Sequence, residues 1–390
     1  MSLGQYRIAF FCYCAFIGAF STQWAIYLKQ HLGFGDGTIG VLNGLFLLSI
    51  LVANLVVSRI ADARRNRLAL QRIMSALGCG VCFLWPLATE AWQVALMLLL
   101  QGWTCHVQVS MLDASIVDRL GKNRARYGTV RAFGTIGYGV AVFAVSRMRN
   151  GDPTQFFTLV QAALIAFHLS TWLLPRSQVA PAEQRPHLAL STVFYNRPLL
   201  VLLGTTFTYS CSFACYEVFG SLYFTEAGLS EHAIGNLYVA SSLAEILVFF
   251  LTPLFLRRWH ARHIIAFSML VCAARWAVMS QTSDHDTLVL LQISHALCFG
   301  LWWGATIHIM GRLVDAEVRT SGQALLAMSF SAGFGVGGTL CGLVRASAGG
   351  AVALQASAVL AALSGLVVLC MQRVFDDTRL AGDPRHVGVT

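Results

Sequence analysis

Charged side chains are scarce in this chain of 390 residues, where Asp, Glu, Lys and Arg together make up 12% of the sequence. An average soluble chain carries about 25% of such residues. Hydrophobic residues, by contrast, make up 56% of the chain. So little charge excludes an ordinary soluble domain, whose surface needs polar groups to stay hydrated. Only eight prolines are present, so helix breakers do not rule out long helices.

Sequence motifs of common enzymes are also missing. We find no phosphate-binding loop of the Gly-x-x-x-x-Gly-Lys type, no Gly-x-Ser-x-Gly turn and no His-Glu-x-x-His motif. Among the eleven cysteines, Cys79 and Cys82 have the spacing of a metal or redox pair, but no second pair or histidine cluster accompanies them. We interpret them as small apolar helix residues and expect no enzyme, metal or cofactor.

Long apolar runs fill most of the chain. Each is near the 20 residues or so that a helix needs to cross a hydrocarbon core of roughly 30 Å. Helices are expected because lipid offers free backbone groups no hydrogen-bond partner. The twelve predicted spans are 6–29, 38–59, 69–88, 92–118, 125–148, 155–175, 196–225, 231–256, 263–281, 285–311, 320–345 and 350–372.

The net charge of +9 is spread unevenly along the chain. If both termini are cytoplasmic, 21 of the 27 Lys and Arg residues lie in the loops and ends on that side. This excess is the positive-inside pattern of membrane proteins, so the basic surplus reflects topology and not nucleic-acid binding. We predict a multi-pass protein of the inner (plasma) membrane with both termini in the cytoplasm.

The two halves of the sequence resemble each other. Thr38–Leu42 and Ala233–Leu237 each open an apolar run, and they lie 195 residues apart, half the chain length. Glycine-rich runs at 128–139 and 333–338 fall in the fifth and eleventh predicted helices, where glycine permits close helix packing. Parallel repeats of this kind are how many secondary transporters build a central site.

This repeat, with a polar, proline-containing interval near the midpoint, predicts the domain organisation. The expected fold class is an all-α membrane protein with twelve transmembrane helices in two six-helix pseudo-repeats. We assign 1–175 to the first bundle, 176–195 to a cytoplasmic linker, 196–375 to the second bundle and 376–390 to a cytoplasmic tail. We expect a monomer in the lipid bilayer.

Charged side chains inside the predicted spans are the candidate functional groups. A charge at mid-bilayer costs roughly 2.5–3.5 kcal/mol, so each one needs a partner or a wet cavity. The set consists of Asp113, Arg131, Glu217, Glu245 and Arg275, with His295 beside them. We pair Asp113 with Arg131. Arg275 is paired with Glu245 or Glu217.

Such pairs suit proton coupling. A carboxyl group among apolar side chains favours its protonated form, and a nearby arginine favours the charged form. A carboxylate that gains and loses its arginine therefore releases and binds a proton. His295 is a candidate relay near neutral pH, with a satisfied core histidine as the alternative.

Aromatic residues accompany these groups in the predicted helices. A flat substrate can stack on such rings. Trp and Tyr at helix ends also serve as interfacial anchors, which is the competing interpretation. The candidates for substrate contact are Trp24, Tyr27, Tyr138, Tyr216 and Trp302.

Taken together, these residues resemble the major facilitator superfamily, in particular its branch of phenylpropionate and lactose permeases. The resemblance spans nearly the whole chain. Its clearest motifs are Tyr127-Gly128-Thr129-Val130-Arg131, Ile234-Gly235, Ala244-Glu245, Arg275-Trp276 and Gln292-Ile293-Ser294-His295.

The resemblance implies a role for each matching position. Asp113 and Arg131 match the carboxylate and arginine that hold the sugar in lactose permease, and Tyr138 matches a stacking tryptophan. Glu245, Arg275 and His295 match groups linked to substrate binding or proton movement. That permease has a second acid where this chain has Cys298. The resemblance therefore implies that Glu245 or Glu217 carries the coupled proton here.

A loop between the second and third predicted helices resembles the superfamily's loop at that place. Asp62 and Arg65 fit its pattern, although its usual glycines are missing. The resemblance implies a conformational latch near the cytoplasmic face. A plain helix-end cap is the alternative.

Three functions remain open from the sequence. The first is proton-coupled uptake of a small organic substrate by alternating access, with an aromatic carboxylate favoured and a sugar or nucleoside as alternatives. The second is proton-antiport efflux of drugs or metabolites on the same fold. The third is a membrane sensor that transports nothing. For the first two, the partners are a small molecule and protons.

Overall fold

The computed structural model describes residues 3–63, 67–120, 127–148, 154–175, 196–314 and 319–371. Within these ranges every regular element is helical, and twelve helical segments are long and apolar enough to cross a membrane. The predicted all-α class and its twelve spans are therefore confirmed. Hydrogen bonds closed within each helix leave few backbone groups to the lipid, which is why apolar runs of this length fold as helices.

Six of these spans come from each half of the chain. The first half contains α1 (Gly4–Ser21), α2 (Trp24–Ile26), η1 (Tyr27–His31), α3 (Asp36–Ala63), α4 (Arg67–Leu84), η2 (Trp85–Leu87), α5 (Ala91–Gln101), η3 (Gly102–His106), α6 (Gln108–Leu120), α7 (Tyr127–Met148) and α8 (Phe156–Leu173). The second half contains α10 (Arg197–Glu226), α11 (Glu231–Arg258), α12 (Ala261–Met279), α13 (His285–His295), η5 (Ala296–Leu301), α14 (Trp302–Leu313), α15 (Arg319–Ala348) and α16 (Gly350–Cys370).

Two spans change their helical winding at equivalent places. The π-helical segment η3 joins α5 to α6, and the π-helical segment η5 joins α13 to α14. They begin at Gly102 and Ala296, close to the spacing of 195 residues between the sequence repeats. Short π segments within α-helices are frequent at functional sites. The repeat thus extends to local backbone geometry beside the predicted polar groups.

Glycine brings the same pair of helices together in each half. In the first half α1 packs against α7, and a Cβ on Gly137 would collide with the backbone of Phe11. In the second half α10 packs against α15, and a Cβ on Gly337 would collide with the backbone of Cys211. The predicted role of the two glycine runs in close helix packing is confirmed at these positions.

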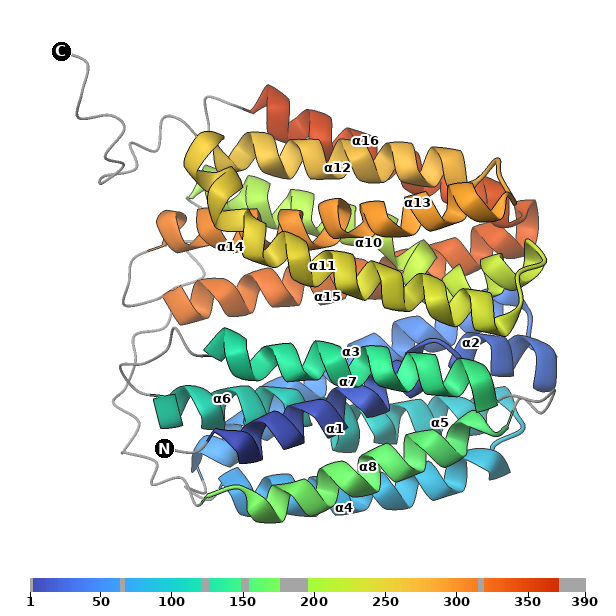
Figure 1. Cartoon of the computed structure of the whole chain (residues 1–390), viewed down its shortest axis with the longest axis vertical. Coiled ribbons are helices and arrows are strands. Elements are labelled where there is room, and N and C mark those ends of the chain that lie inside the picture. The colour runs from blue at the N-terminus through green and yellow to red at the C-terminus, as the bar shows by residue number, and fades with distance from the viewer. Residues whose placement is uncertain are drawn as a thin grey trace.

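The two halves lie against each other along two helix pairs, α3 with α15 and α7 with α11 (Figure 1). Their closest approaches fall at one end of the bundle, where α3 and α11 begin and α7 and α15 end; we call it the distal end. A Cβ on Gly40 would lie 2.8 Å from the carbonyl oxygen of Gly338. A Cβ on Gly235 of α11 would collide with the side chain of Ser146 of α7. The distal ends of the two halves are therefore tightly packed.

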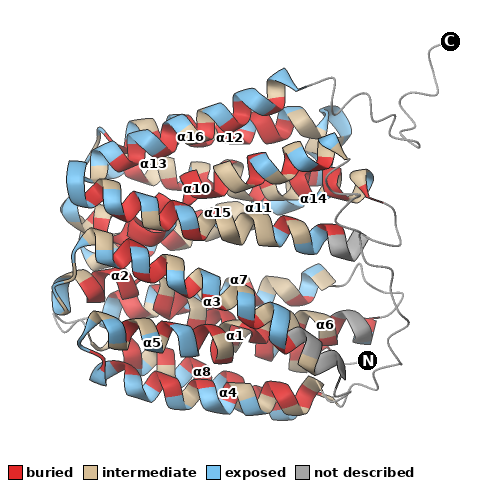
Figure 2. Ribbon diagram, turned by 180° about the vertical axis from the view of Figure 1, so that it is seen from behind, coloured by how far each residue is buried: buried red, intermediate tan, exposed pale blue. Residues whose placement is uncertain are grey.

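Large apolar side chains cover the outside of the bundle. Leu48, Phe250 and Leu290 are more than half exposed, and exposed residues follow the outward faces of the helices in Figure 2. Such a surface is stable only where hydrocarbon surrounds it. Buried polar residues lie inside, including Gln71, Gln101 and Gln292. Polar chemistry is thus confined to the interior and the two ends.

Candidate functional site

Arg275 is the centre of a polar cluster in the second half. It lies on α12, is 2% exposed, and its Nη2 donates to Gln292 Oε1 at 2.7 Å. The guanidinium carbon lies 4.4 Å from the ring centre of Tyr216 and 4.5 Å from that of Trp276. Tyr216 also donates its hydroxyl to Gln292 Oε1 at 2.9 Å. The cation is therefore enclosed by rings and by a neutral acceptor.

His295 connects this cluster to a carboxylate. Its Nδ1 lies 3.3 Å from Arg275 Nη1, and its Nε2 lies 3.7 Å from Glu245 Oε2. Because arginine only donates, Nδ1 must accept, which places the imidazole proton on Nε2, facing Glu245. The predicted partner of Arg275 was Glu245 or Glu217, but the arginine reaches Glu245 through His295. The result is a polar chain from α11 through α13 to α12.

Glu217 is exposed although it lies in the middle of α10 between buried neighbours. It interacts electrostatically with His295 and Glu245 of the second half and with Tyr138 of the first. An exposed side chain with such partners faces solvent-accessible space between the two halves. Glu245 borders the same region, with its side chain 21% exposed.

In the first half, Asp113 and Arg131 lie near each other and are both half-buried. Tyr127 donates its hydroxyl to Asp113 Oδ1 at 2.7 Å. Arg131 Nη1 lies 3.5 Å from Cys14 Sγ, and its guanidinium lies 5.4 Å from the ring centre of Phe10. The two charges interact electrostatically, but the contacts of the described residues include no ion pair between them. Arg131 thus retains donor capacity for a ligand.

One face of α7 connects the region of Asp113 and Arg131 with the region of Glu217 and Glu245. Arg131, Gly134 and Tyr138 recur at helical spacing, and seven residues of helix rise about 10 Å. Tyr138 is half-buried and interacts with Ser21 of its own half and with Glu217 and Glu245 of the other. A stripe about 10 Å long therefore runs from a guanidinium to a ring that interacts electrostatically with acids of the opposite half.

Four of the predicted aromatic contacts lie in the packed core. Trp24 is 6% exposed and stacks on Phe20, and Tyr27 is 3% exposed against Phe157. Tyr216 and Trp302 are 1% and 0% exposed. None has a free face for a ligand in this conformation, so their contact with substrate stays a prediction. Tyr138 alone of the five rings is accessible.

Sequence reasoning missed several polar and aromatic groups. Gln292 was part of a recognised motif, yet its bond to Arg275 was not expected, although it lies one turn before His295. Half-buried Phe299 and Trp303 stack at 6.1 Å beside the π segment η5, where the changed winding sets their direction. Gln292 and Phe299 lie at helical spacing from His295, so the sequence offers a signal for both residues, but it offers none for the π segment.

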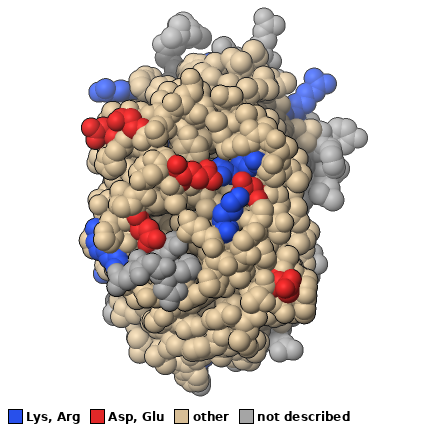
Figure 3. Space-filling view, turned by 90° about the vertical axis from the view of Figure 1, so that its right-hand side faces the viewer, with Lys and Arg blue, Asp and Glu red and all other residues tan. Residues whose placement is uncertain are grey.

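An ion network closes the distal end of the bundle. Asp36 accepts from Lys29 at 2.7 Å within the first half and pairs with Arg345 of α15 at 3.4 Å. Arg345 also binds Glu226 of α10 at 2.7 Å. Figure 3 shows acidic and basic side chains gathered at the centre of this end. The 5% exposed Arg345 therefore ties α15 to α10 of its own half and to α3 of the other half.

A hydrogen bond between side chains also joins the two halves, from α7 to α11. Arg147 Nη2 donates to Asn236 Oδ1 at 3.0 Å, next to the contact between Gly235 and Ser146. The predicted latch consists of Asp62, in the last turn of α3, and Arg65. Arg65 and the side chain of Asp62 lie outside the described residues. The links between halves that can be described are those of the distal end.

Twelve spans in two packed halves, with acids and arginines inside the spans, define a secondary transporter of the major facilitator superfamily. The chain belongs to the family described as the MFS_1 like family, whose model matches residues 3–355. It is a multi-pass inner-membrane transporter of a small molecule and not an enzyme, in agreement with the predicted superfamily.

Individual relatives agree with this assignment. The chain is 26% identical over 323 residues to a probable 3-phenylpropionic acid transporter of Escherichia coli (strain K12), covering 80% of this chain and 83% of the relative. It is 21% identical over 343 residues to a maltose permease of Geobacillus stearothermophilus, covering 87% and 84%.

Solved structures show the same fold. The nucleoside transporter NupG matches with a TM-score of 0.81 at 19% identity, covering 95% of this chain and 98% of NupG. A bacterial homologue of the human lysosomal transporter Spinster, solved in an inward-facing and unoccupied conformation, matches with a TM-score of 0.81 at 14% identity. That match covers 98% of this chain and 100% of the homologue.

Proposed function

We propose that this transporter takes up a small aromatic carboxylate together with a proton by alternating access. The observation that carries the proposal is the polar chain from Glu245 through His295 to Arg275, which borders accessible space beside Glu217 and Tyr138. This series places a carboxylate 3.7 Å from an imidazole that lies 3.3 Å from a fixed cation. Such a series can hold and pass a proton while a substrate occupies the space nearby.

The first half supports an aromatic carboxylate as the substrate. Arg131 is half-buried, keeps donor capacity and can bind a carboxylate by charge-assisted hydrogen bonds. Tyr138 lies about 10 Å further along the same face of α7, within reach of an aromatic ring on a short spacer. The relative named as a probable 3-phenylpropionic acid transporter supports a ligand of this shape. Arg275 is enclosed and serves the proton chain instead.

The orientation follows from the charges of the loops. With both termini cytoplasmic and 176–195 as a cytoplasmic linker between the domains 1–175 and 196–375, the distal end faces outward. Its ion network and glycine contacts then hold the outer side closed, as expected for an inward-facing monomer. Alternating access requires these links to break when the outer side opens.

Proteoliposomes containing the purified protein test the function. We expect an inward proton gradient to drive accumulation of a labelled phenylpropionate-type acid, and a protonophore to abolish it. Unlabelled aromatic acids should compete, whereas sugars and nucleosides should not. Emptying of loaded vesicles by the same gradient would instead favour proton-antiport efflux. Absence of any flux would favour the non-transporting sensor.

A further inference from the structure

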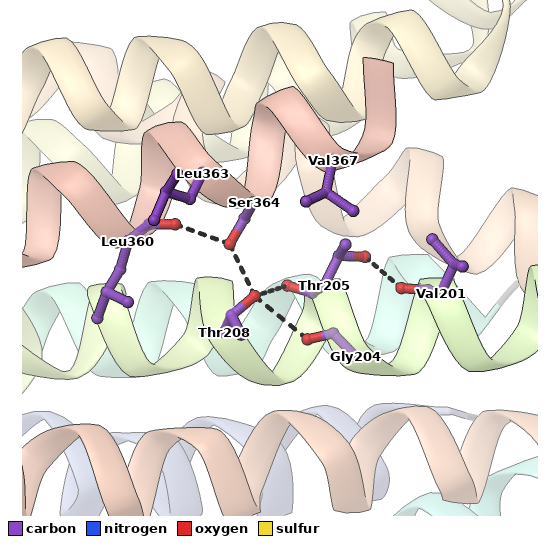
Figure 4. Close-up of a pocket in the computed structure, with 8 residues that line it drawn as sticks. All are labelled: Val201, Gly204, Thr205, Thr208, Leu360, Leu363, Ser364 and Val367. Carbon is purple, nitrogen blue, oxygen red and sulfur yellow. Dashed lines mark hydrogen bonds between the residues drawn. The ribbon is translucent and has the colours of Figure 1, made fainter. Parts of the chain in front are cut away.

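A cavity lies between α10 and α16, lined by none of the residues of the proposed transport site. It has a volume of about 330 Å³ and an almost wholly apolar lining. An apolar protein cavity of roughly 150 Å³ is already large enough to bind benzene. Figure 4 shows its two walls, with Val201, Gly204 and Thr208 on α10 facing α16. The cavity is therefore a groove with room for a hydrocarbon ligand.

The residues of the opposite wall show that the groove opens toward lipid. Leu363 and Val367 of α16 line it and are 53% and 42% exposed. Large exposed apolar side chains in a membrane-spanning helix face lipid. The hydroxyl of Ser364 also lines the groove, but it is bonded to Thr208 at 2.7 Å and to the Leu360 carbonyl at 2.8 Å. The hydroxyl therefore does not need a hydrogen bond from a ligand inside the groove.

A basic residue, Arg197, lies at the end of α10 that is next to the groove. Arg197, Val201 and Thr208 recur at spacings that place them on one face of the helix, with Arg197 one turn beyond the groove. Arg197 is exposed. In the orientation proposed above, this end of α10 lies at the cytoplasmic leaflet, whose anionic lipids attract basic side chains next to the membrane. An apolar groove leading to a cation matches the chemistry of an anionic phospholipid.

We propose that the groove between α10 and α16 is a binding site for an anionic phospholipid of the cytoplasmic leaflet. One acyl chain lies in the groove along Val201 and Val367, and the phosphate pairs with Arg197. The space above Gly204 is open, since a Cβ there would meet nothing within 4 Å, so a larger side chain at this position would fill the groove. The site is independent of the transported substrate.

Native mass spectrometry of the purified, delipidated protein tests this site with phosphatidylglycerol and phosphatidylcholine of equal acyl chains. We expect phosphatidylglycerol to bind about fivefold more tightly, the effect of about 1 kcal/mol for one basic side chain at an anionic surface. Arg197→Gln should abolish that difference. Gly204→Leu, which fills the groove, should remove one bound lipid of either kind.

Gly80→Leu is the matched control, because Gly80 is another exposed helix glycine whose Cβ would meet nothing within 4 Å. It should keep the lipid. If Gly204→Leu does not fold, Val367→Trp narrows the groove from the other wall and should have the same effect. Equal lipid binding by these variants and wild type, or equal affinity for the two lipids, would overturn the proposal. A dimer that Gly204→Leu dissociates would assign the groove to a second copy instead.

Discussion

Glu245 carries the clearest prediction at the scale of single residues. Glu245→Gln keeps the size and polarity of the side chain beside His295 Nε2, but the amide can no longer take up a proton. We expect uphill accumulation in proteoliposomes to fall to background while exchange of internal for external substrate continues. Glu90→Gln, at an exposed helix cap, is the control. Normal accumulation by Glu245→Gln would remove Glu245 from coupling.

Arg131 is predicted to bind the substrate carboxylate. Loss of a charge-assisted hydrogen bond costs about 1.5–3 kcal/mol, so Arg131→Ala should weaken binding of an aromatic acid roughly 10- to 100-fold. The affinity for the uncharged amide of the same acid should change little. Calorimetric titration of both ligands measures the difference, with the exposed Arg119→Ala as control. An equal loss for acid and amide would contradict the assignment.

The sequence indicated which charged residues lie in the membrane but not which atoms meet. The cost of burying Arg275 and Glu245 marks both as functional candidates, and their spacing along the chain supports the resemblance. Their connection through His295 depends on how three helices pack, which no local pattern encodes. The burial of Trp24 and Trp302 has the same origin, because a helical pattern does not distinguish a packed core from a wet chamber.

At the scale of helices, the ion network of the distal end is the element expected to move. Asp36→Asn removes the charge that joins α3 to Arg345 of α15 and leaves the positive charge of Arg345 with Glu226 alone. Removing one partner of a buried pair is destabilising because the other charge stays buried. We therefore expect the closed distal end to open more often.

Hydrogen exchange of the backbone amides of 36–46 and 338–348 measures this opening. It should be faster in Asp36→Asn than in wild type. Asp286→Asn removes an aspartate that is 97% exposed and should leave exchange unchanged. Exchange in Asp36→Asn that stays as slow as in the control would show that the network does not hold the halves together.

The helices themselves were largely predictable, whereas their irregularities were not. Apolar runs and loop charges located all twelve spans, because hydrocarbon thickness dictates their length. The π segments at Gly102–His106 and Ala296–Leu301 have no comparable signal. Their winding depends on how side chains of neighbouring helices pack together. The direction of Phe299 and Trp303 therefore had to come from the structure.

At the scale of the whole molecule, the repeat of the sequence becomes a repeat of packing. Equivalent helix pairs are joined by glycine in both halves, and the halves touch each other most closely at the distal end. Rigid halves with a separable contact are the mechanical requirement for alternating access. The residues that differ between the halves, such as Glu217 and Arg131, give the shared scaffold its chemistry.

Simultaneous recording of substrate uptake and internal pH in proteoliposomes tests the central claim most directly. One proton carried with each monoanionic aromatic acid makes the cycle electroneutral. The account therefore predicts acid-driven uptake with matching internal acidification, no response to a membrane potential alone, and loss of both fluxes in Glu245→Gln under uphill conditions. Substrate uptake with no accompanying proton, or uptake driven by potential at equal pH, would contradict it.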